Sequence, residues 1–205
     1  MYTPKFFAAN EREECIRFMK AFNFATLVTA SDGLPTATHL PFIVEDRADQ
    51  IVLVAHMARA NSQWRDLAYG PALVIFSGPH AYVTPRLYGE PQNFPTWNYA
   101  AVHAYGRAAT IESPEENLAL ITRMVEAFDP DYFVGNWRSI DEEYKLSRAR
   151  AVVGFELVVD ELQGKKKMNQ NKSADDARRV IDAFSAGDAN ERQVADLMRE
   201  IYDQS

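Results

Sequence analysis

The stretch HMARANSQW, residues 56–64, is the part of the sequence whose residue types most clearly suggest chemistry. It follows the apolar run Ile51 to Ala55, which predicts a buried strand that ends in cationic and amide side chains. Asn61 is well placed to cap a short helix at residues 62–68. The N–H groups at such a helix start, with the cation of Arg59, would suit a phosphate. The alternative is that Asn61 only caps the helix and that Arg59 lies in solvent.

All four histidines lie between residues 39 and 103, and many aromatic residues share that segment. Flat aromatic walls with polar groups between them suit a planar ligand, because stacking supplies contact area and the polar edges fix orientation. A tyrosine-rich dimer interface is the alternative. The set comprises His39, His56, His80 and His103 with Trp64, Tyr82, Tyr88, Phe94, Trp97, Tyr99 and Tyr105.

Other kinds of site lack their usual signatures. The sequence has no HxH, HExxH or paired CxxC, so it does not predict a metal site. GxSxG is absent, and Cys15 lies among acidic residues that favour a packed, inert thiol. There is no Walker loop or GxGxxG, so a bound phosphate would not be held by a P-loop or a Rossmann turn.

Composition narrows the class of protein. The chain has 205 residues, 47% of them hydrophobic, which is enough to bury a core. Its net charge of -7 argues against a broad cationic face that grips nucleic acid. No apolar stretch is long enough to span a membrane, and the first residues do not resemble a signal peptide. With a single cysteine, these features predict a cytoplasmic protein with no membrane partner.

The hydrophobic periodicity predicts many strands at hairpin spacing with few helices between them, which is typical of an antiparallel barrel. Pro35 and Pro41 would place part of the second strand at an edge or beside a ligand. The expected fold is therefore mainly β with α (α+β). Strands are predicted at 24–29, 36–44, 50–56, 72–76, 80–84, 99–111 and 152–162, and helices at 10–21, 62–68, 114–128 and 141–150.

The C-terminal segment has a different character. Helices are predicted at 174–186 and 190–202, after the basic run Lys165-Lys166-Lys167. Although two helices suggest a DNA-binding motif, acidic residues such as Glu191 and Glu200 on the second one would repel phosphates. We therefore expect residues 1–163 to form the barrel domain, and residues 164–205 to form a basic loop and helical extension packed on that same domain.

Five blocks, in order along the chain, resemble the signatures of PaiB-type FMN-binding negative transcriptional regulators. The resemblance runs from residue 1 to about residue 180, and the opening Met1 to Phe6 fits as well. The blocks are Thr38 to Pro41, His56 to Asn61, Gly78 to Pro85, Pro95 to Gly106 and Lys167 to Asn171.

This resemblance implies a flavin-reductase-like split β-barrel, with peripheral helices and a helical C-terminal tail, that binds FMN at a homodimer interface. It implies that the FMN phosphate meets the turn after the third strand, and that the isoalloxazine ring lies along the second. The second subunit would complete the site. The implied residues are His56, Arg59, Ala60 and Asn61 for the phosphate, Thr38, His39 and Leu40 for the ring, and Trp97, Asn98, Lys167, Gln170 and Asn171 from the partner subunit.

The chain departs from the family pattern at a few positions, which puts the tightness of FMN binding in question. Arg86-Leu87 stands where Ser-Trp is usual, so a stacking surface is missing. Ser62 replaces a proline that pre-sets the first helical turn. Asn169 replaces a serine and changes the reach of a polar group.

The sequence leaves three functions open. The first is an FMN-binding negative regulator whose flavin biases affinity for DNA or a protein. The second is an FMN-dependent oxidoreductase of the same barrel class, in which the flavin carries the chemistry and no general base need appear in the sequence. The third is a haem-binding split-barrel protein that uses a histidine as axial ligand.

Overall fold

The computed structural model describes residues 1–9, 11–90 and 92–202, so Asn10, where the first predicted helix begins, lies outside the described residues. The chain divides into two compact units. The first contains Met1–Phe18, Ser77–Val102 and the chain from Gln163 onward, and the second contains Met19–Phe76 and His103–Leu162.

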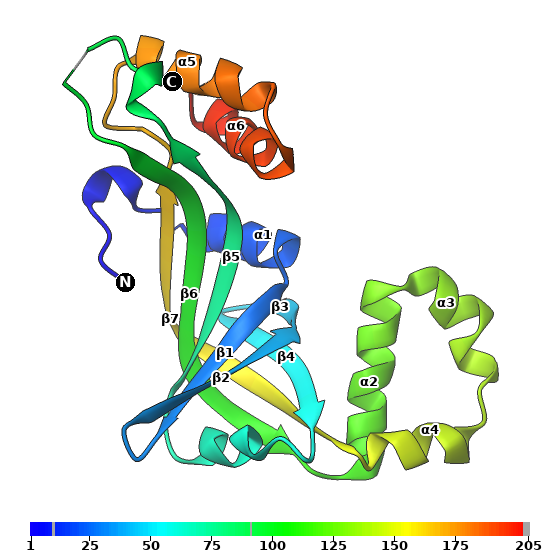
Figure 1. The fold of residues 1–205 in the computed structure, drawn as a ribbon. Coiled ribbons are helices and arrows are strands. Elements are labelled where there is room, and N and C mark those ends of the chain that lie inside the picture. Colours follow the sequence, from blue (N-terminus) through cyan, green and yellow to red (C-terminus); the bar gives the residue numbers. More distant parts are fainter. Residues whose placement is uncertain (10, 91, 203–205) are drawn as a thin grey trace. The chain divides into compact units, whose positions relative to one another are not determined.

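Seven strands form one sheet in the order β2-β1-β5-β6-β7-β4-β3 (Figure 1). The pairings of β1 with β2 and β5, and of β4 with β3 and β7, are antiparallel. The sheet does not close, because β2 and β3 are its two edges. The predicted α+β fold with an antiparallel split barrel is confirmed. The strands are β1 (Phe24–Ser31), β2 (Leu34–Pro41), β3 (Ile43–Arg47), β4 (Gln50–Ala58), β5 (Ala72–Val83), β6 (Thr96–Ile111) and β7 (Val152–Lys167).

The prediction of one strand over residues 36–44 is wrong, because the chain leaves one edge of the sheet at Pro41 and joins the other at Ile43. Pro41 has no N–H to donate, and Phe42 donates its own N–H to Asn23 O at 2.9 Å instead of to a neighbouring strand. The Phe42 side chain is buried against Phe76 and Phe155. A core residue therefore marks the gap between the two edges.

The prediction of two strands at 72–76 and 80–84 is also wrong, because β5 runs unbroken through Ser77-Gly78-Pro79. A Cβ atom at Gly78 would lie 2.8 Å from Cζ of Phe18, so only glycine lets the strand pass this ring. Phe18 belongs to α1 (Arg12–Ala21), whose Cys15 is 1% exposed. The Cys15 thiol donates to Ala9 O at 3.2 Å, and burial raises its pKa to about 11.

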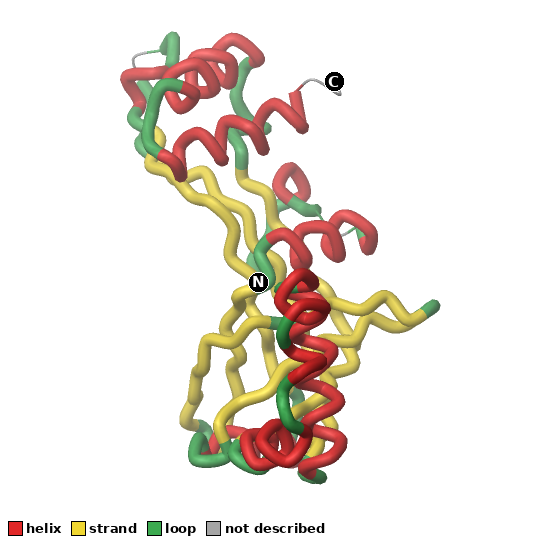
Figure 2. Tube along the Cα trace, turned by 90° about the vertical axis from the view of Figure 1, so that its right-hand side faces the viewer, coloured by secondary structure: helices red, strands yellow, loops and turns green. Residues whose placement is uncertain are grey.

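A group of helices lies beside β4 in the second unit, and α2 is the member that packs on the strand (Figures 1 and 2). Leu120 and Met124 of α2 pack against Val52 and Val54, and Ser113 caps the helix by accepting from Glu116 N at 3.3 Å. The predicted helix at 114–128 has the observed bounds, whereas α3 was not predicted. These helices are α2 (Pro114–Phe128), α3 (Pro130–Gly135), η4 (Trp137–Ser139) and α4 (Glu142–Ala149).

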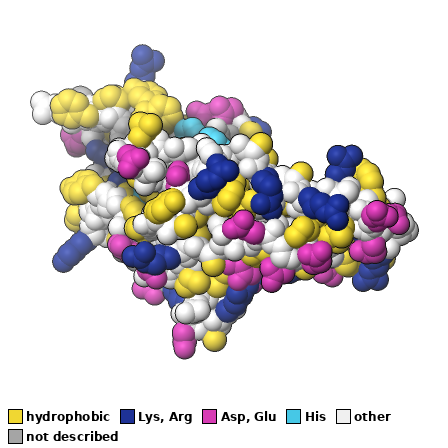
Figure 3. Space-filling model, turned by 90° about the horizontal axis from the view of Figure 1, so that it is seen from below, with side chains coloured by type: hydrophobic (Ala, Val, Ile, Leu, Met, Phe, Trp, Pro, Cys, Tyr) yellow, Lys and Arg dark blue, Asp and Glu magenta, His cyan; other side chains and the backbone are white. Residues whose placement is uncertain are grey.

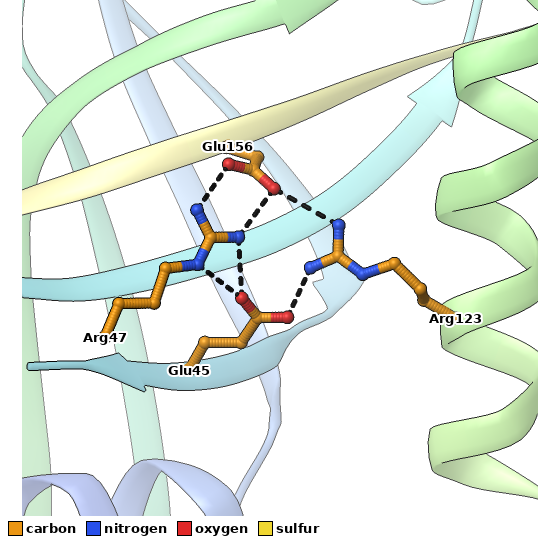
Figure 4. Close-up of polar contacts among 4 residues, drawn as sticks. All are labelled: Glu45, Arg47, Arg123 and Glu156. Atoms are coloured by element: carbon orange, nitrogen blue, oxygen red, sulfur yellow. Dashed lines mark hydrogen bonds and ion pairs between the residues drawn. The ribbon is translucent and has the colours of Figure 1, made fainter.

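Four charged side chains join α2 to the sheet (Figure 4). Arg47 donates to both oxygens of Glu156, at 2.8 and 2.7 Å, and to Glu45 at 2.7 Å. Arg123 of α2 contacts the same two carboxylates, with 3.3 Å to Glu156. These contacts lower the pKa of Glu156, chiefly through the hydrogen bonds from Arg47. We call these four residues the charged network.

In the first unit the C-terminal helices α5 (Ala174–Ser185) and α6 (Ala189–Tyr202) pack on each other, close to the predicted bounds. Each turns an apolar stripe inward, represented by the fully buried Val180 and Met198. The unit also holds the 3₁₀ helices η1 (Lys5–Phe7) and η3 (Pro85–Leu87). No helix in the described part of the chain has both the length and the apolar character needed to cross a bilayer.

Candidate functional site

The turn after β4 has the local structure that the sequence predicts. η2 (Ser62–Ala68) has the predicted bounds, and Asn61 caps it by accepting from Gln63 N at 3.1 Å. However, η2 is a 3₁₀ helix of only seven residues, so its dipole is a weak source of anion affinity. An anion at this turn would therefore have to be held mainly by side chains.

Those side chains are joined by hydrogen bonds. Asn61 Nδ2 donates to Thr38 Oγ1 at 2.9 Å, and Thr38 Oγ1 donates to Gln63 Oε1. Gln63 Nε2 lies 3.2 Å from Thr29 Oγ1, which donates to Asp66 Oδ2 at 3.1 Å. We call these five residues the polar relay. Sequence reasoning missed the roles of Gln63, Thr29 and Asp66, for which the only local signal is the place of Gln63 two residues after a helix cap.

Arg59 does not point freely into solvent. Its Nε donates to Arg150 O at 3.0 Å, and its Nη2 donates to the carbonyl oxygens of Glu112 and Val152, both at 3.1 Å. The remaining Nη1 lies 3.9 Å from Glu112 Oε2. Most of this guanidinium therefore ties the end of β4 to the start of β7, and Nη1 is the part left for an anion.

His56 lies on the side of β4 that faces α2. Its Nδ1 is 3.1 Å from Met124 Sδ, and burial lowers the pKa of the ring. A half-buried, neutral imidazole packed against a helix has little to offer a phosphate. Ala60, in contrast, is exposed in the turn itself.

The strand Thr38-His39-Leu40 presents its side chains to two faces of the sheet. Thr38 joins the polar relay, and Leu40 is buried in the core. His39 is exposed on the opposite face, where Thr26 lies across from it and Ile75 lies across from Thr26. We call the face that carries His39, Thr26 and Ile75 the outer face.

The outer face has flat and apolar groups that its own unit does not cover. Phe24, 64% exposed, stacks on the His39 ring with 6.4 Å between centroids and 23° between planes. Val28, on the same side of β1, is paired with Ala37 and Leu73 and is half-buried. A planar ligand could lie here with aromatic and aliphatic contacts.

His103 belongs to the same unit and lies 6.4 Å from Tyr105, centroid to centroid. Its Nδ1 is buried and has no hydrogen-bond partner among the described residues. Burial lowers the pKa of this ring. A buried nitrogen without a partner is uncommon in a protein interior, and a hydrogen-bonding ligand group would satisfy it.

The other five predicted residues lie in the first unit, and the structure treats neighbouring positions differently. Trp97 is 52% exposed and packs against His80 and Tyr82, with centroids 6.0 and 5.8 Å away. Asn98 is fully buried beneath α6, where Nδ2 contacts Met198 Sδ at 3.4 Å. Asn98 Oδ1 has no partner within the described chain. Trp97 is therefore accessible to a ligand, whereas Asn98 is covered.

The end of β7 is also largely satisfied within its own unit. Lys167 Nζ donates to Trp97 O at 2.8 Å and contacts Thr96 Oγ1. Gln170 accepts from Met168 N at 2.7 Å and donates to Lys166 O at 2.6 Å. Asn171 is exposed.

Asn169, one of the departures from the family pattern, is buried in a left-handed conformation with φ of 65°. Its Nδ2 donates to the Tyr88 hydroxyl at 3.2 Å. Asparagine tolerates this backbone region better than serine does, so the departure agrees with the local geometry.

The lysine run does not form a free cationic surface. Lys165 is 8% exposed, with its Nζ 5.2 Å from the Tyr99 ring centroid. Lys166 pairs with Glu14 at 2.5 Å and lies 3.9 Å from Glu200.

Figure 3 shows basic and acidic side chains interspersed on the face in view. Within the described ranges, no group of three or more His, Cys, Asp or Glu side chains could hold a metal ion.

Comparison with solved structures identifies the class of fold. The flavocytochrome Anf3 from Azotobacter vinelandii matches with a TM-score of 0.64 and 17% identity, covering 86% of this chain and 78% of that one. The FAD and heme binding protein from Mycobacterium smegmatis matches with a TM-score of 0.62 and 20% identity, covering 83% and 78%. At these identities the matches show a shared fold, that of flavin-binding split-barrel proteins.

Comparison of sequences identifies the family. Residues 1–161 match the model described as "Putative FMN-binding domain". The chain is 35% identical over 204 residues to "Protease synthase and sporulation protein PAI 2" of Bacillus subtilis (strain 168), covering 98% of this chain and 97% of that protein. This chain belongs to the PaiB-type FMN-binding family, as its motifs predict, and its cofactor is FMN.

The residues present fit this cofactor. The outer face offers a flat ring a stacked pair at Phe24 and His39, and the buried Nδ1 of His103 has no partner in the described part of the chain. The turn after β4 offers amide and guanidinium N–H groups, which suit phosphate oxygens. When bound, FMN would supply hydride or electron transfer, while these side chains bind and orient it.

Proposed function

We propose that this chain is a homodimeric FMN-binding regulator of the negative-regulator type, with the flavin held at the dimer interface. The observation that carries the proposal is the outer face, where Phe24 and His39 stand exposed on β1 and β2, whereas α2 packs on β4. A second copy would cover these rings and enclose the flavin. Burying exposed aromatic side chains is a main source of stability in dimer interfaces.

Within this proposal each part of FMN has its own protein groups. The phosphate lies at the turn after β4, where the Asn61 amide, the Ala60 backbone and Arg59 Nη1 donate to it. The ring lies against His39. From the partner copy the proposal takes Trp97 and Asn171, because both are exposed.

The regulatory part of the proposal requires a partner, which the family resemblance implies to be DNA. The lysine run is a poor candidate for that contact, since Lys166 is paired with Glu14 and Lys165 is buried. Flavin binding would instead act through the dimer, by changing how strongly the two copies associate. The association would in turn set the spacing between the two copies of the surface that contacts DNA.

The visible spectrum and the solution mass of the purified protein, measured with and without added FMN, test the proposal together. We expect a yellow protein and a dimer that FMN strengthens. Gel-shift titrations with genomic fragments, with and without FMN, test the regulatory role. A monomer that stays colourless in excess FMN contradicts the site and the dimer, and a dimer that shifts no DNA contradicts the DNA-binding role.

The oxidoreductase class remains the second candidate, because FMN at a protein surface can exchange electrons with a soluble reductant. Steady oxidation of a nicotinamide cofactor by the FMN-loaded protein would favour it. Flavin that stays oxidised in the presence of the reductant would remove it. The haem-binding class keeps only the general argument that a histidine can serve as an axial ligand. A purified protein that is red instead of yellow would support it.

A further inference from the structure

We propose that Gln63 is the positioning residue that makes this turn select FMN over riboflavin, by passing the hydrogen-bond direction set at the buried end of the polar relay on to Thr38 and Asn61. This inference rests on the proposed phosphate position. Gln63 does not contact the phosphate or the ring of FMN in the proposed site, because its side chain is 1% exposed beneath the turn. It acts through Thr38 and Asn61.

The direction of the relay is set at its buried end. Asp66 carries a carboxylate, which accepts hydrogen bonds when ionised, so the Thr29 hydroxyl must donate to it across 3.1 Å. Thr29 has only one hydroxyl hydrogen. Its oxygen must therefore act as the acceptor toward Gln63, 3.2 Å away.

The backbone fixes the Gln63 amide in the same sense. Nε2 lies 3.0 Å from Thr36 O and 3.3 Å from Leu27 O, and both of these carbonyl oxygens can only accept. The opposite orientation of the amide would set its oxygen against these two carbonyls and leave no donor for them. Three acceptors thus turn the nitrogen of Gln63 toward the sheet and its oxygen toward Thr38.

The consequence reaches the surface of the turn. Thr38 spends its single hydroxyl hydrogen on Gln63 Oε1 and accepts from Asn61 Nδ2 at 2.9 Å. Asn61 Oδ1 is occupied by Gln63 N at 3.1 Å. The Asn61 amide is therefore held with its nitrogen inward on Thr38 and one further N–H available, so the turn presents a donor to an anion. The Thr38 hydroxyl positions this donor and has no hydrogen left for the ligand.

Riboflavin is the matched ligand for a test, because it has the ring of FMN and lacks the phosphate. Both flavins would be titrated into the full-length parent, Gln63→Leu, Thr29→Val and Thr29→Ser, with the dissociation constants read from flavin fluorescence. Thr29→Val keeps the shape and removes the hydroxyl. Thr29→Ser keeps the hydroxyl and is the matched control.

We expect the parent to bind FMN more tightly than riboflavin. Gln63→Leu should weaken FMN binding about tenfold, the value of one well-placed hydrogen bond, and change riboflavin binding less than about twofold. Thr29→Val should shift the ratio of the two affinities in the same direction, and Thr29→Ser should restore it. A general loss of folding would lower both affinities together, so the ratio separates positioning from stability.

Any one of three results would overturn the inference. If Gln63→Leu and Thr29→Val both keep the parent's ratio of affinities, Gln63 is only a buried amide that joins strands. If Gln63→Leu does not fold, the isosteric Thr29→Val carries the test alone, and an unchanged ratio there is decisive. If the parent binds riboflavin as tightly as FMN, the phosphate does not lie at this turn, and the proposed site fails before the relay is tested.

Discussion

The second unit contains two hydrogen-bonded networks that each join a helix to strands of the sheet, one through mostly uncharged side chains and the other through charged ones. The polar relay joins η2 to β1 and β2 through side chains of which only Asp66 is an acid, and its central amide is 1% exposed. The charged network joins α2 to β3 and β7 through four ionised side chains that are 25% to 42% exposed. The two networks therefore differ in how far water can reach them.

The difference matters because an unmade hydrogen bond costs most where water cannot replace it. Water can replace the contacts of Arg47 or Glu156 when one of them is lost. It cannot readily replace those of Gln63. The relay should therefore contribute more to stability and should hold one geometry, whereas the charged network should contribute less and respond to salt and pH.

The largest expected effect is that of Gln63→Leu on stability. The substitution leaves Leu27 O and Thr36 O without their donor, so we expect a loss of about 2 kcal/mol in the free energy of unfolding. Urea denaturation at low and high salt would measure it. The loss should be the same at both salt concentrations, and a strong dependence on salt would contradict the distinction between the two networks.

A smaller effect is expected for Arg47→Ala, which removes the two-pronged contact with Glu156. At low salt we expect a loss of roughly 1 kcal/mol, which shrinks as salt is added because the pair is partly exposed. Arg178→Ala is the control, since its pair with Asp175 is 69% and 74% exposed and should contribute almost nothing. Equal losses from the two arginines would mean that the network adds nothing beyond an ordinary surface pair.

The smallest effect is a change in pH dependence. Since the folded-state pKa of Glu156 lies below the ordinary value of 4.5, its contribution is present above that pH and is lost as the pH falls through the lowered pKa. Glu156→Gln should therefore flatten the decline of stability below about pH 4.5. Melting temperatures measured from pH 6 to pH 3 would show it. An unchanged slope would assign the decline to other carboxylates.

His56 gives a separate pH dependence, which comes from a base that is neutral in the folded state and not from an ionised acid. Burial lowers its pKa, so the folded state favours the neutral ring and stability falls as the pH drops below about 6.5. His56→Gln should remove part of this decline while leaving stability above pH 7 nearly unchanged. The same melting series, extended to pH 8, measures both histidine and glutamate effects.

Features set by neighbouring residues could be predicted from the sequence. Asn61 caps η2 where the local pattern places it, because the cap accepts from an N–H two residues away. Most strand positions followed from periodicity in the same way, but the bounds at Phe42 and within β5 did not. The family resemblance supplied the cofactor, which no local pattern identified.

Features set by distant residues could not be predicted. The break at Phe42 depends on which edge each flanking strand joins, and the unbroken β5 depends on how Phe18 meets Gly78. Likewise, nothing near Gln63 in the sequence shows that its partners are Leu27, Thr29 and Thr36. Asn98 looks like a surface residue until Met198, far along the chain, packs over it.

The buried thiol of Cys15 has a practical consequence for all of these measurements. With a pKa of about 11, only about one molecule in ten thousand carries the reactive thiolate at neutral pH, and the sulfur is screened from solvent as well. Maleimide reagents should therefore not react with Cys15 in the native protein. A cysteine introduced at a chosen surface position could carry a fluorophore or spin label as the sole reporter, with no need to remove the natural one first.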